Sequence, residues 1–325
     1  MDSIVGNGAA RTMKAIRIHE YGAASVLRLE EAPVPDVAAD EVLVEVHAAG
    51  INPADWQFRY GYYKDFAPRP MPFILGWDVA GVVKSTGARV ERWKVGDPVF
   101  AMADMSRNGA YAELIAVRAE YLAPAPTALP LEHAAGVPLA ALTAWKALFD
   151  VGQLQPGQSV LVHAAAGGVG LFAVQLAKRA GARVTATVSS ANSELVGSLG
   201  VDQIIDYRTM DFRKQLANVD LVIDTVGGET RDRSWGVLRK SSGTLVAVAM
   251  PPPDPDIALE HGVRAAMTQV RPDGQRLTEI GRLIDAGELR VVIDSEFPLE
   301  QAAAAHERSE SRHARGKIIL RVPRQ

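Results

Sequence analysis

The stretch Gln158–Gly170 reads QSVLVHAAAGGVG, an apolar run that ends in a glycine-rich turn. Ala173 and Ala177 follow at helical spacing. Because an apolar run, a glycine turn and a helical period succeed one another, the sequence predicts a strand over Ser159–His163 and a helix over Val169–Ala180. A strand–turn–helix unit of this kind is the usual start of a parallel sheet with helical crossovers.

The glycine-rich turn matches the dinucleotide fingerprint, with Ala165, Gly167 and Gly170 in the three glycine positions. The backbone at Gly167 would approach a pyrophosphate, and the helix would pack closely on the strand at Gly170. Free N–H groups at the helix start, at Gly168 and Val169, would bind the phosphates. The alternative is a tight strand–helix turn without a ligand.

Alternating strand and helix patterns continue after this unit. They comprise strand Arg183–Val188, helix Asn192–Leu199, strands Gln203–Asp206 and Leu221–Asp224, a helix around Thr230–Leu238 and strand Thr244–Val248. Such alternation predicts an α/β fold, a Rossmann doubly wound parallel sheet. A helix over Gly274–Ala286 and strand-like segments at Val291–Ile293 and Lys317–Val322 follow.

The chain before the turn is β-rich. Short strand patterns, separated by proline and glycine turns, lie at Lys14–His19, Val42–His47, Ile74–Lys84 and Asp97–Met102. Helical spacing over Leu131–Val151 leads into the glycine-rich unit. The simplest architecture is a β-rich domain interrupted by the doubly wound domain, with the C-terminal segment returning to the first.

Composition narrows the function classes. A net charge of −3 over 325 residues gives no field that would collect nucleic acid. The absence of cysteine excludes disulfides, cysteine-ligated zinc and thiol nucleophiles. The sequence contains no run of 18 apolar residues, so no membrane span is expected. Residues 1–12 are expected to be a disordered leader without the features of a signal peptide. A cytoplasmic location is the expectation.

The end of the second predicted strand indicates which nicotinamide cofactor would bind. An NAD enzyme usually places an acid there, whereas this strand ends in Ser189, Ser190 and Asn192. Hydroxyl and amide donors in place of an acid favour NADPH, with Tyr207 closing over the 2′-phosphate. Ser189 and Ser190 could equally cap the following helix.

Five runs together resemble a known family. They are AAGINPAD (48–55), LGWDVAGVV (75–83), AALTAWKAL (140–148), VLVHAAAGGVG (160–170) and HARGKIIL (313–320). In this order they are similar to the zinc-independent medium-chain dehydrogenase/reductases, the quinone oxidoreductase (zeta-crystallin-like) group. The resemblance implies a GroES-like catalytic domain over residues 13–136 and 275–325 and a Rossmann domain over residues 137–274.

The resemblance also implies that no metal is bound. Zinc-dependent relatives hold catalytic zinc with a cysteine where this sequence has Asn52, and with a His–Glu pair where it has Trp77 and Asp78. Asparagine and tryptophan are not zinc ligands of such sites. Hydride transfer without a Lewis acid suits a quinone or an α,β-unsaturated carbonyl.

Further site residues follow from the resemblance. Asn52 is expected to contact the nicotinamide or the substrate oxygen, although an Asx-turn before Pro53 would also explain it. Thr143 matches a residue near the nicotinamide, or is only helix packing. The resemblance places Thr225, Val226 and Gly227 against the cofactor ribose and nicotinamide, and Gly316 and Lys317 in a loop that reaches the cofactor, with Lys317 beside a phosphate.

Aromatic residues after Asn52 are candidates for the substrate pocket. Phe58, Tyr60 and Tyr63 could flank a planar substrate, and Trp77 is expected to fill volume left by the metal. A tyrosine present in several quinone oxidoreductases is replaced by Gln57, and Asp55 receives no firm role.

Two alternatives to a quinone or enone reductase stay open. One is a trans-acting enoyl reductase for a thioester in lipid or polyketide synthesis, and the other is a non-catalytic NADPH-binding redox sensor. Relatives commonly pair through an edge strand, so Gly262–Val270 is the candidate edge of a homodimer.

Overall fold

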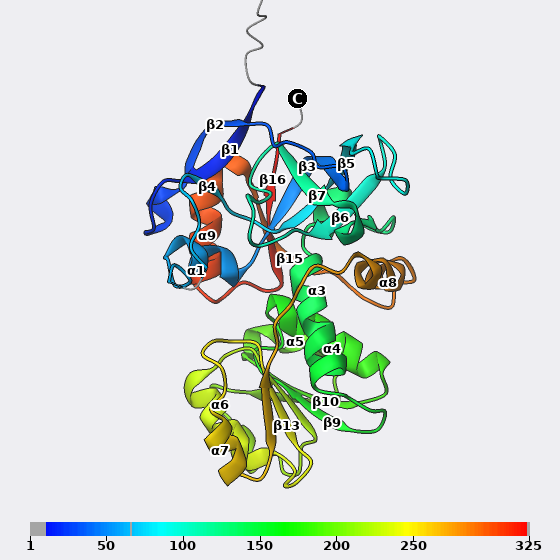
Figure 1. Ribbon diagram of the computed structural model, residues 1–325. Coiled ribbons are helices and arrows are strands. Elements are labelled where there is room, and N and C mark those ends of the chain that lie inside the picture. The colour runs from blue at the N-terminus through cyan, green and yellow to red at the C-terminus, as the bar shows by residue number, and fades with distance from the viewer. Residues whose placement is uncertain (1–10, 66, 324–325) are drawn as a thin grey trace, which may run out of the picture.

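The glycine-rich stretch contains the first strand of a six-stranded sheet, and all five strand pairs of this sheet are parallel. Its order is β11-β10-β9-β12-β13-β14. The strands are β9 (Ser159–Val162), β10 (Arg183–Val188), β11 (Gln203–Asp206), β12 (Leu221–Asp224), β13 (Thr244–Ala247) and β14 (Arg264–Met267). The computed structural model describes residues 11–65 and 67–323, and it shows this sheet in the lower half of the molecule (Figure 1).

Helices cover both faces of this sheet. They are α4 (Gly168–Arg179), α5 (Ser193–Gly197), α6 (Gly228–Ser234) and α7 (Pro255–Glu260). Val160 and Val162 pack in the same core cluster as α4 and α5, whereas Leu161 packs in the cluster that includes α7. Successive side chains of a strand point to opposite faces, so the alternation confirms the predicted doubly wound sheet.

The upper half of the molecule contains the other two sheets (Figure 1). A seven-stranded sheet has the order β15-β16-β3-β5-β6-β8, with β7 also paired to β3, and β2-β1-β4 form a small antiparallel sheet. The strands are β1 (Thr12–Ile18), β2 (Arg28–Pro33), β3 (Glu41–Ile51), β4 (Phe73–Ile74), β5 (Asp78–Thr86), β6 (Pro98–Met102), β7 (Leu114–Arg118), β8 (Ala123–Pro124), β15 (Ile293–Pro298) and β16 (Lys317–Arg321). The predicted return of the C-terminal segment to the first domain is therefore confirmed.

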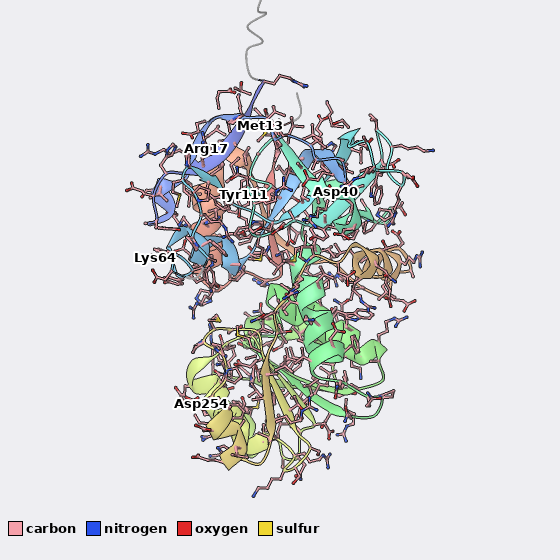
Figure 2. All side chains as sticks on the ribbon, in the orientation of Figure 1. Met13, Arg17, Asp40, Lys64, Tyr111 and Asp254 are labelled. Carbon is pink, nitrogen blue, oxygen red and sulfur yellow. The ribbon has the colours of Figure 1, made fainter. Side chains whose placement is uncertain are left out.

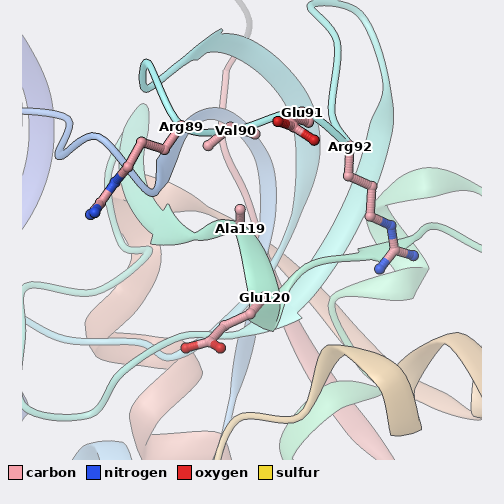
Figure 3. A pocket seen from close by; sticks show the side chains of 6 residues that line it. All are labelled: Arg89, Val90, Glu91, Arg92, Ala119 and Glu120. Atoms are coloured by element: carbon pink, nitrogen blue, oxygen red, sulfur yellow. The ribbon is translucent and has the colours of Figure 1, made fainter.

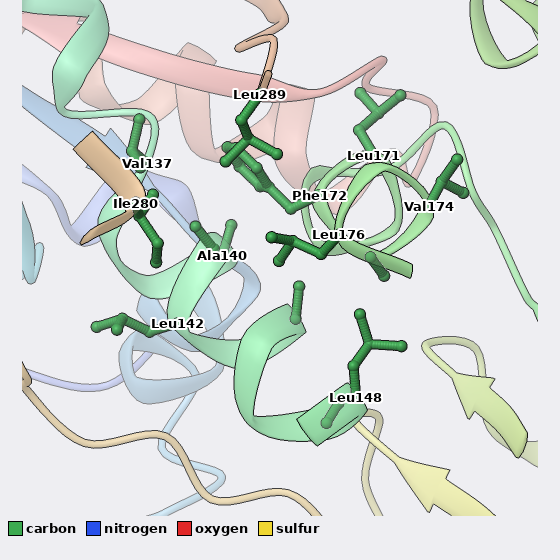
Figure 4. Close-up of a cluster of buried hydrophobic side chains, with 14 of the residues drawn as sticks. Val137, Ala140, Leu142, Leu148, Leu171, Phe172, Val174, Leu176, Ile280 and Leu289 are labelled. Carbon is green, nitrogen blue, oxygen red and sulfur yellow. The ribbon is translucent and has the colours of Figure 1, made fainter. Parts of the chain in front are cut away.

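Five further α-helices lie in the described residues. They are α1 (Pro53–Arg59), α2 (Leu131–Ala134), α3 (Pro138–Trp145), α8 (Gly274–Asp285) and α9 (Ala302–Glu310). Side chains of α3, α4 and α8 form one buried cluster, to which Leu142, Phe172 and Ile280 contribute (Figure 4). This shared apolar core fixes the two halves against each other. None of the helices in the described ranges combines the length and apolar character needed to cross a bilayer.

One expectation on local structure is wrong. The helix predicted over Leu131–Val151 is divided into α2, α3 and a π-helical turn at Lys146–Val151. Pro138 is the cause of the first break, because its ring cannot follow a preceding helical turn but suits the first position of a new helix. The leader predicted for residues 1–12 falls mostly outside the described residues, and Thr12 already pairs with Pro33 in the small sheet. The domain boundaries at 136/137 and 274/275 stay a prediction.

Candidate active site

Three neighbouring strand ends of the seven-stranded sheet bring together Asn52, Asp78 and Lys317. Ile51, the last residue of β3, pairs with Ile318 of β16, and Gly50 pairs with Asp78 of β5. Because β5 and β16 both run antiparallel to β3, their first residues lie beside its last ones. The register therefore places an amide, a carboxylate and an ammonium at one edge of the sheet.

Asn52 is hydrogen-bonded within this group. Its side chain Nδ2 donates to Asp78 Oδ2 at 2.9 Å, and its Oδ1 accepts a hydrogen bond from Lys317 Nζ. The Asn52 backbone N–H donates to Asp55 Oδ2 at 2.6 Å, at the start of α1. The side chain therefore belongs to the group with Asp78 and Lys317, and not only to the turn before Pro53 that was considered from the sequence.

Asp78 connects the two halves of the molecule. Its Oδ1 accepts from the backbone N–H of Leu139, in the first turn of α3, at 2.7 Å. Its Oδ2 lies 3.6 Å from Lys317 Nζ. Burial raises the pKa of Asp78, and burial lowers the pKa of Lys317, while each charge opposes the shift of the other. Only a paired, hydrogen-bonded arrangement makes two buried charges tolerable.

The glycine-rich turn lies next to this group. Gly167 and Gly316 form a parallel bridge, and the Gly316 N–H donates to Ala166 O at 3.0 Å. A Cβ on Gly170 would lie 2.5 Å from Ala164 O, so this glycine permits the close packing of α4 on β9. A Cβ on Gly167 would meet Ala164 O alone within 4 Å, at 3.2 Å. The turn is therefore tight beneath α4 and open at Gly167.

Lys317 bonds to groups at the end of β3. Its ammonium donates to Ile51 O at 3.0 Å and to Asn52, away from the amides at the start of α4. Its stem lies over the turn, since a Cβ on Gly168 would be 3.0 Å from Lys317 Cδ. In the structure the ammonium forms an ion pair with Asp78, because a buried carboxylate at the neighbouring strand end attracts it, and a contact of Lys317 with a phosphate stays a prediction.

Thr143 forms a hydrogen bond within its own helix. It is buried, and its Oγ1 donates to Leu139 O at 2.6 Å, one turn earlier in α3. A hydroxyl that is satisfied within its own helix has its donor committed. This contact fits helix packing, and the proximity of Thr143 to a nicotinamide stays a prediction.

The carboxyl ends of β10 and β11 bring the remaining polar residues together. Ser189 is buried, Ser190 is exposed, and Tyr207 is 54% exposed. Asp206, which the sequence analysis passed over, accepts from the Ser190 N–H at 3.1 Å. An acid therefore reaches the end of β10 from the adjacent strand. Only the parallel register, which pairs Val188 with Asp206, shows this.

The turn after β12 is built on a buried ion pair that the sequence analysis did not identify. Asp224 Oδ1 accepts from the N–H groups of Val226 and Gly227 at 3.0 and 2.8 Å, and Asp224 Oδ2 accepts from Arg231 Nε at 2.6 Å. Thr225 Oγ1 donates to His163 O at 2.7 Å. Thr225, Val226 and Gly227 thus follow β12 at the same sheet end as the glycine-rich turn.

The four predicted pocket aromatics separate into two groups. Phe58 packs against Tyr63 and Trp77, with ring centroids 4.6 and 4.9 Å apart. Trp77 is entirely buried, as expected of a residue that fills volume. Tyr60 instead stacks on Tyr62 and donates to Glu310 on α9, so it does not join the other three.

A second buried polar chain lies behind Asn52. Tyr111 OH and His306 Nε2 are 3.1 Å apart, and Arg59 Nη1 lies 3.2 Å from His306 Nδ1. Tyr111, at the centre of the upper half in Figure 2, also interacts with the Asp55 carboxyl. Burial raises the pKa of Asp55 to about 7 and lowers the pKa of His306 to about 3. These groups are far apart in sequence, so no local sequence motif predicts that they lie together.

No group of three or more His, Cys, Asp or Glu side chains suited to a metal occurs within the described residues. Two surface pockets lie elsewhere. One of about 300 Å³ is lined by Arg89–Arg92, Ala119 and Glu120 (Figure 3). The other, of about 470 Å³, includes Ser159 and Arg183, the first residues of β9 and β10. Dinucleotides bind at the opposite, carboxyl end of such a sheet.

Comparison with known proteins agrees with this geometry. Residues 38–127 match the alcohol dehydrogenase GroES-like domain family, and residues 199–320 match the zinc-binding dehydrogenase family. A mitochondrial NAD(P)H oxidoreductase of Danio rerio is 33% identical over 97% of this chain and 93% of its own length. The chloroplastic NADPH-dependent alkenal/one oxidoreductase of Arabidopsis thaliana is 35% identical over 95% of this chain and 80% of its own.

Solved structures are similar over the whole fold. The Coxiella burnetii quinone oxidoreductase superposes with a TM-score of 0.88 at 33% identity, covering 96% of this chain and 100% of that one. The Escherichia coli quinone oxidoreductase complexed with NADPH gives 0.85 at 31% identity, with 95% and 99% covered. The CurK enoyl reductase gives 0.88 at 28% identity, with 96% and 100% covered. The chain therefore belongs to the medium-chain dehydrogenase/reductase superfamily of oxidoreductases, in its quinone oxidoreductase group.

Proposed function

We propose that this protein is an NADPH-dependent, zinc-independent reductase that transfers a hydride to a quinone or an α,β-unsaturated carbonyl. The observation that carries the proposal is the contact between Gly167 and Gly316. This contact brings the glycine-rich turn of one half against the strand ends of the other half, which hold Asn52. A dinucleotide on the turn and a polar group for the substrate would then share one site.

The residues at the turn fit a dinucleotide. Gly167 leaves the approach to its backbone open, and α4 begins at the next residue. The first N–H groups of a helix have no partner inside it, so those of Gly168, Val169 and Gly170 would bind phosphate oxygens. Ala165 keeps the turn tight. A bound nicotinamide cofactor would supply the hydride.

NADPH is proposed over NADH from the groups at the ends of β10 and β11. Ser190 and Tyr207 are exposed there, as is Arg208, whose guanidinium lies 5.8 Å from the Tyr207 ring centroid. An arginine and a serine hydroxyl would bind a 2′-phosphate. Asn192 Oδ1 is buried and has no hydrogen-bond partner within the described ranges, which fits a ribose hydroxyl. Asp206 is held by the N–H groups of Ser190 and Arg208.

The substrate class follows from the polar groups near Asn52. Asn52 Nδ2 is a hydrogen-bond donor, and a donor stabilises the negative charge that grows on a carbonyl oxygen as a hydride arrives. Quinones and enones spread that charge by delocalisation, so one neutral donor is sufficient. Zinc independence is proposed because Asn52 and Trp77 offer no zinc donors and the sequence has no cysteine.

An enoyl thioester is the second candidate substrate. The similarity to the CurK enoyl reductase favours it, and the same donor at Asn52 would serve a thioester carbonyl. A redox sensor that binds NADPH without turnover is the third candidate and would have the same cofactor turn.

The test is oxidation of NADPH and NADH, followed by the absorbance of the reduced nicotinamide, with a benzoquinone, a naphthoquinone, a simple enone and an enoyl thioester. Turnover with NADPH and a quinone or enone is expected. Turnover of the thioester alone would move the assignment to an enoyl reductase, and tight binding without turnover would favour a sensor. Elemental analysis that finds zinc bound in equal amount to the chain would contradict the metal proposal.

We also propose a homodimer joined through β14. This strand is the edge of the six-stranded sheet, and Arg264–Met267 would continue that sheet across two subunits. An unpaired edge strand is a ready template for such pairing. Sedimentation that gives a monomer at micromolar concentration would contradict this proposal.

A further inference from the structure

We propose that the Lys317 ammonium is a positioning group of this site. It holds the Asn52 carboxamide with the amide nitrogen toward the substrate oxygen, and it polarises that amide. This inference rests on the function proposed above, in which Asn52 Nδ2 donates a hydrogen bond to the substrate oxygen. Lys317 is 4% exposed and Asn52 is 1% exposed, so both are removed from bulk water. A charge in such surroundings acts more strongly than one at the surface.

The hydrogen bonds leave only one orientation for the Asn52 amide. A lysine ammonium has donors and no acceptor, so the atom that it contacts on Asn52 must be the carbonyl Oδ1. Asp78 Oδ2, an acceptor, then faces Nδ2 at 2.9 Å. The oxygen and nitrogen of an asparagine side chain are alike in size and shape, so their partners must distinguish them. Here a cation on one side and a carboxylate on the other determine the assignment.

This orientation leaves one N–H of Nδ2 beyond the bond to Asp78. The ammonium that donates to Oδ1 draws electrons toward that oxygen and makes the N–H a stronger donor, as hydrogen bonds in a chain polarise one another. A donor is what the oxygen of a quinone or enone needs during hydride transfer. If the amide were reversed, its oxygen would repel the growing negative charge.

The ligands of the ammonium are all oxygens at the strand ends where zinc-dependent relatives hold their metal. They are Ile51 O at 3.0 Å, Asn52 Oδ1 and Asp78 Oδ2 at 3.6 Å. Asn52 and Asp78 are two of the three positions that match zinc-site residues in the family resemblance, and Trp77 is the third. A lysine thus supplies positive charge in a site whose side chains do not favour zinc.

The same lysine also contacts the cofactor turn. Its methylene stem covers Gly168, and its own backbone N–H donates to Val292 O at 2.9 Å. The stem therefore runs from the glycine-rich turn to Asn52. The competing explanation is that Lys317 swings out to bind a phosphate, in which case its loss would weaken cofactor binding.

Steady-state kinetics separate these two roles. We expect Lys317→Met to lower kcat about 10- to 100-fold, the usual effect of removing an outer group that orients a ligand at metal sites, while the Kd of NADPH changes less than about threefold. Lys317→Arg should recover most of the lost kcat, since a guanidinium also only donates. Lys240→Met, an exposed lysine far from the site in sequence, is the matched control and should behave as the parent. Unchanged kcat, or a loss confined to NADPH binding, would overturn the proposal.

Two measurements keep the proposal testable if Lys317→Met unfolds. Lys317→Met combined with Asp78→Asn leaves no unpaired buried charge, so this protein should fold and still show the low kcat. In the cofactor-free protein, selective ¹⁵N-asparagine labelling gives five side-chain NH2 pairs, because the chain has five asparagines, and the double variant adds a sixth pair from the amide introduced at position 78. The Asn52 pair, identified by its loss in Asn52→Asp, should shift in the double variant and keep its position in Lys317→Arg. A pair that stays in place in the double variant would refute the positioning role, whereas absence of turnover in the parent protein would refute only the proposed function.

Discussion

Replacing Asp55 by Asn should remove a large pH dependence of stability. Asp55 is completely buried, and burial raises the pKa of its carboxyl to about 7. A folded-state pKa above the ordinary value of 3.8 means that the folded protein holds the proton more tightly than the unfolded chain. The stability that this group contributes is therefore complete below pH 3.8 and is lost as the pH rises to about 7. The difference corresponds to about 4 kcal/mol.

The assay is urea unfolding of both proteins at a series of pH values from about 4 to about 8, with the linear extrapolation giving the free energy of unfolding. The amide introduced by Asp55→Asn is neutral throughout this range, and its oxygen can still accept from the Asn52 N–H. The stability of the parent relative to Asp55→Asn should thus fall by about 4 kcal/mol across this range. Other titrating groups, such as the buried His306, act on both proteins and cancel in the difference.

Asp232→Asn is the matched control, because Asp232 is exposed on α6. Its free energy of unfolding is measured over the same interval, so that the loss of an exposed carboxylate is compared with the loss of the buried one. Parallel pH profiles for Asp55→Asn and the parent would refute the reasoning, since they would mean that Asp55 titrates alike in the folded and unfolded chains.

Three further predictions concern the loops around the site. Gly316→Ala should destabilise the protein by about 1–3 kcal/mol and weaken NADPH binding, because a Cβ there would lie 2.3 Å from Val292 O at a φ of +91°; fluorescence titration and urea unfolding would measure both. Arg231→Met should cost about 3–5 kcal/mol in unfolding experiments, since it leaves the buried Asp224 carboxylate without its cation; a smaller loss with the fold retained would contradict the role given to this pair. Ser190→Asp should shift the ratio of kcat/KM values toward NADH, because a carboxylate repels the 2′-phosphate; an unchanged ratio would count against a phosphate at Ser190.

The fold could be predicted from the sequence because its decisive signals are local. The apolar run before Gly167 and the alternation of strand and helix patterns after it led to the six-stranded sheet in its observed order of elements. The break at Pro138 was missed because the apolar spacing on both sides is helical, and periodicity alone does not reveal a change of axis.

The site was predictable only in part, since its polar contacts join residues distant in sequence. Asn52 was identified, but its partner Lys317 is 265 positions away, and the direction of that side chain depends on the Asp78 carboxylate between them. The chain Asp55, Tyr111, His306 has no sequence motif. Individual residues near a glycine turn can be predicted from one sequence, whereas the pairing of buried charges requires the strand register. The cytoplasmic location stays a prediction.

The pairing of β3 with β16 has a consequence for how the chain is made. β3 is a central strand of the seven-stranded sheet, and its end lies 266 positions before the lysine that binds it. Ribosomes add about 5–20 residues per second, so β16 is synthesised on the order of tens of seconds after β3. The inserted nucleotide half, whose six strands are consecutive, has all its strands available earlier. During synthesis the first part of the chain to emerge would therefore be the last to complete its sheet, and its apolar strands would be the segments most exposed to chaperones.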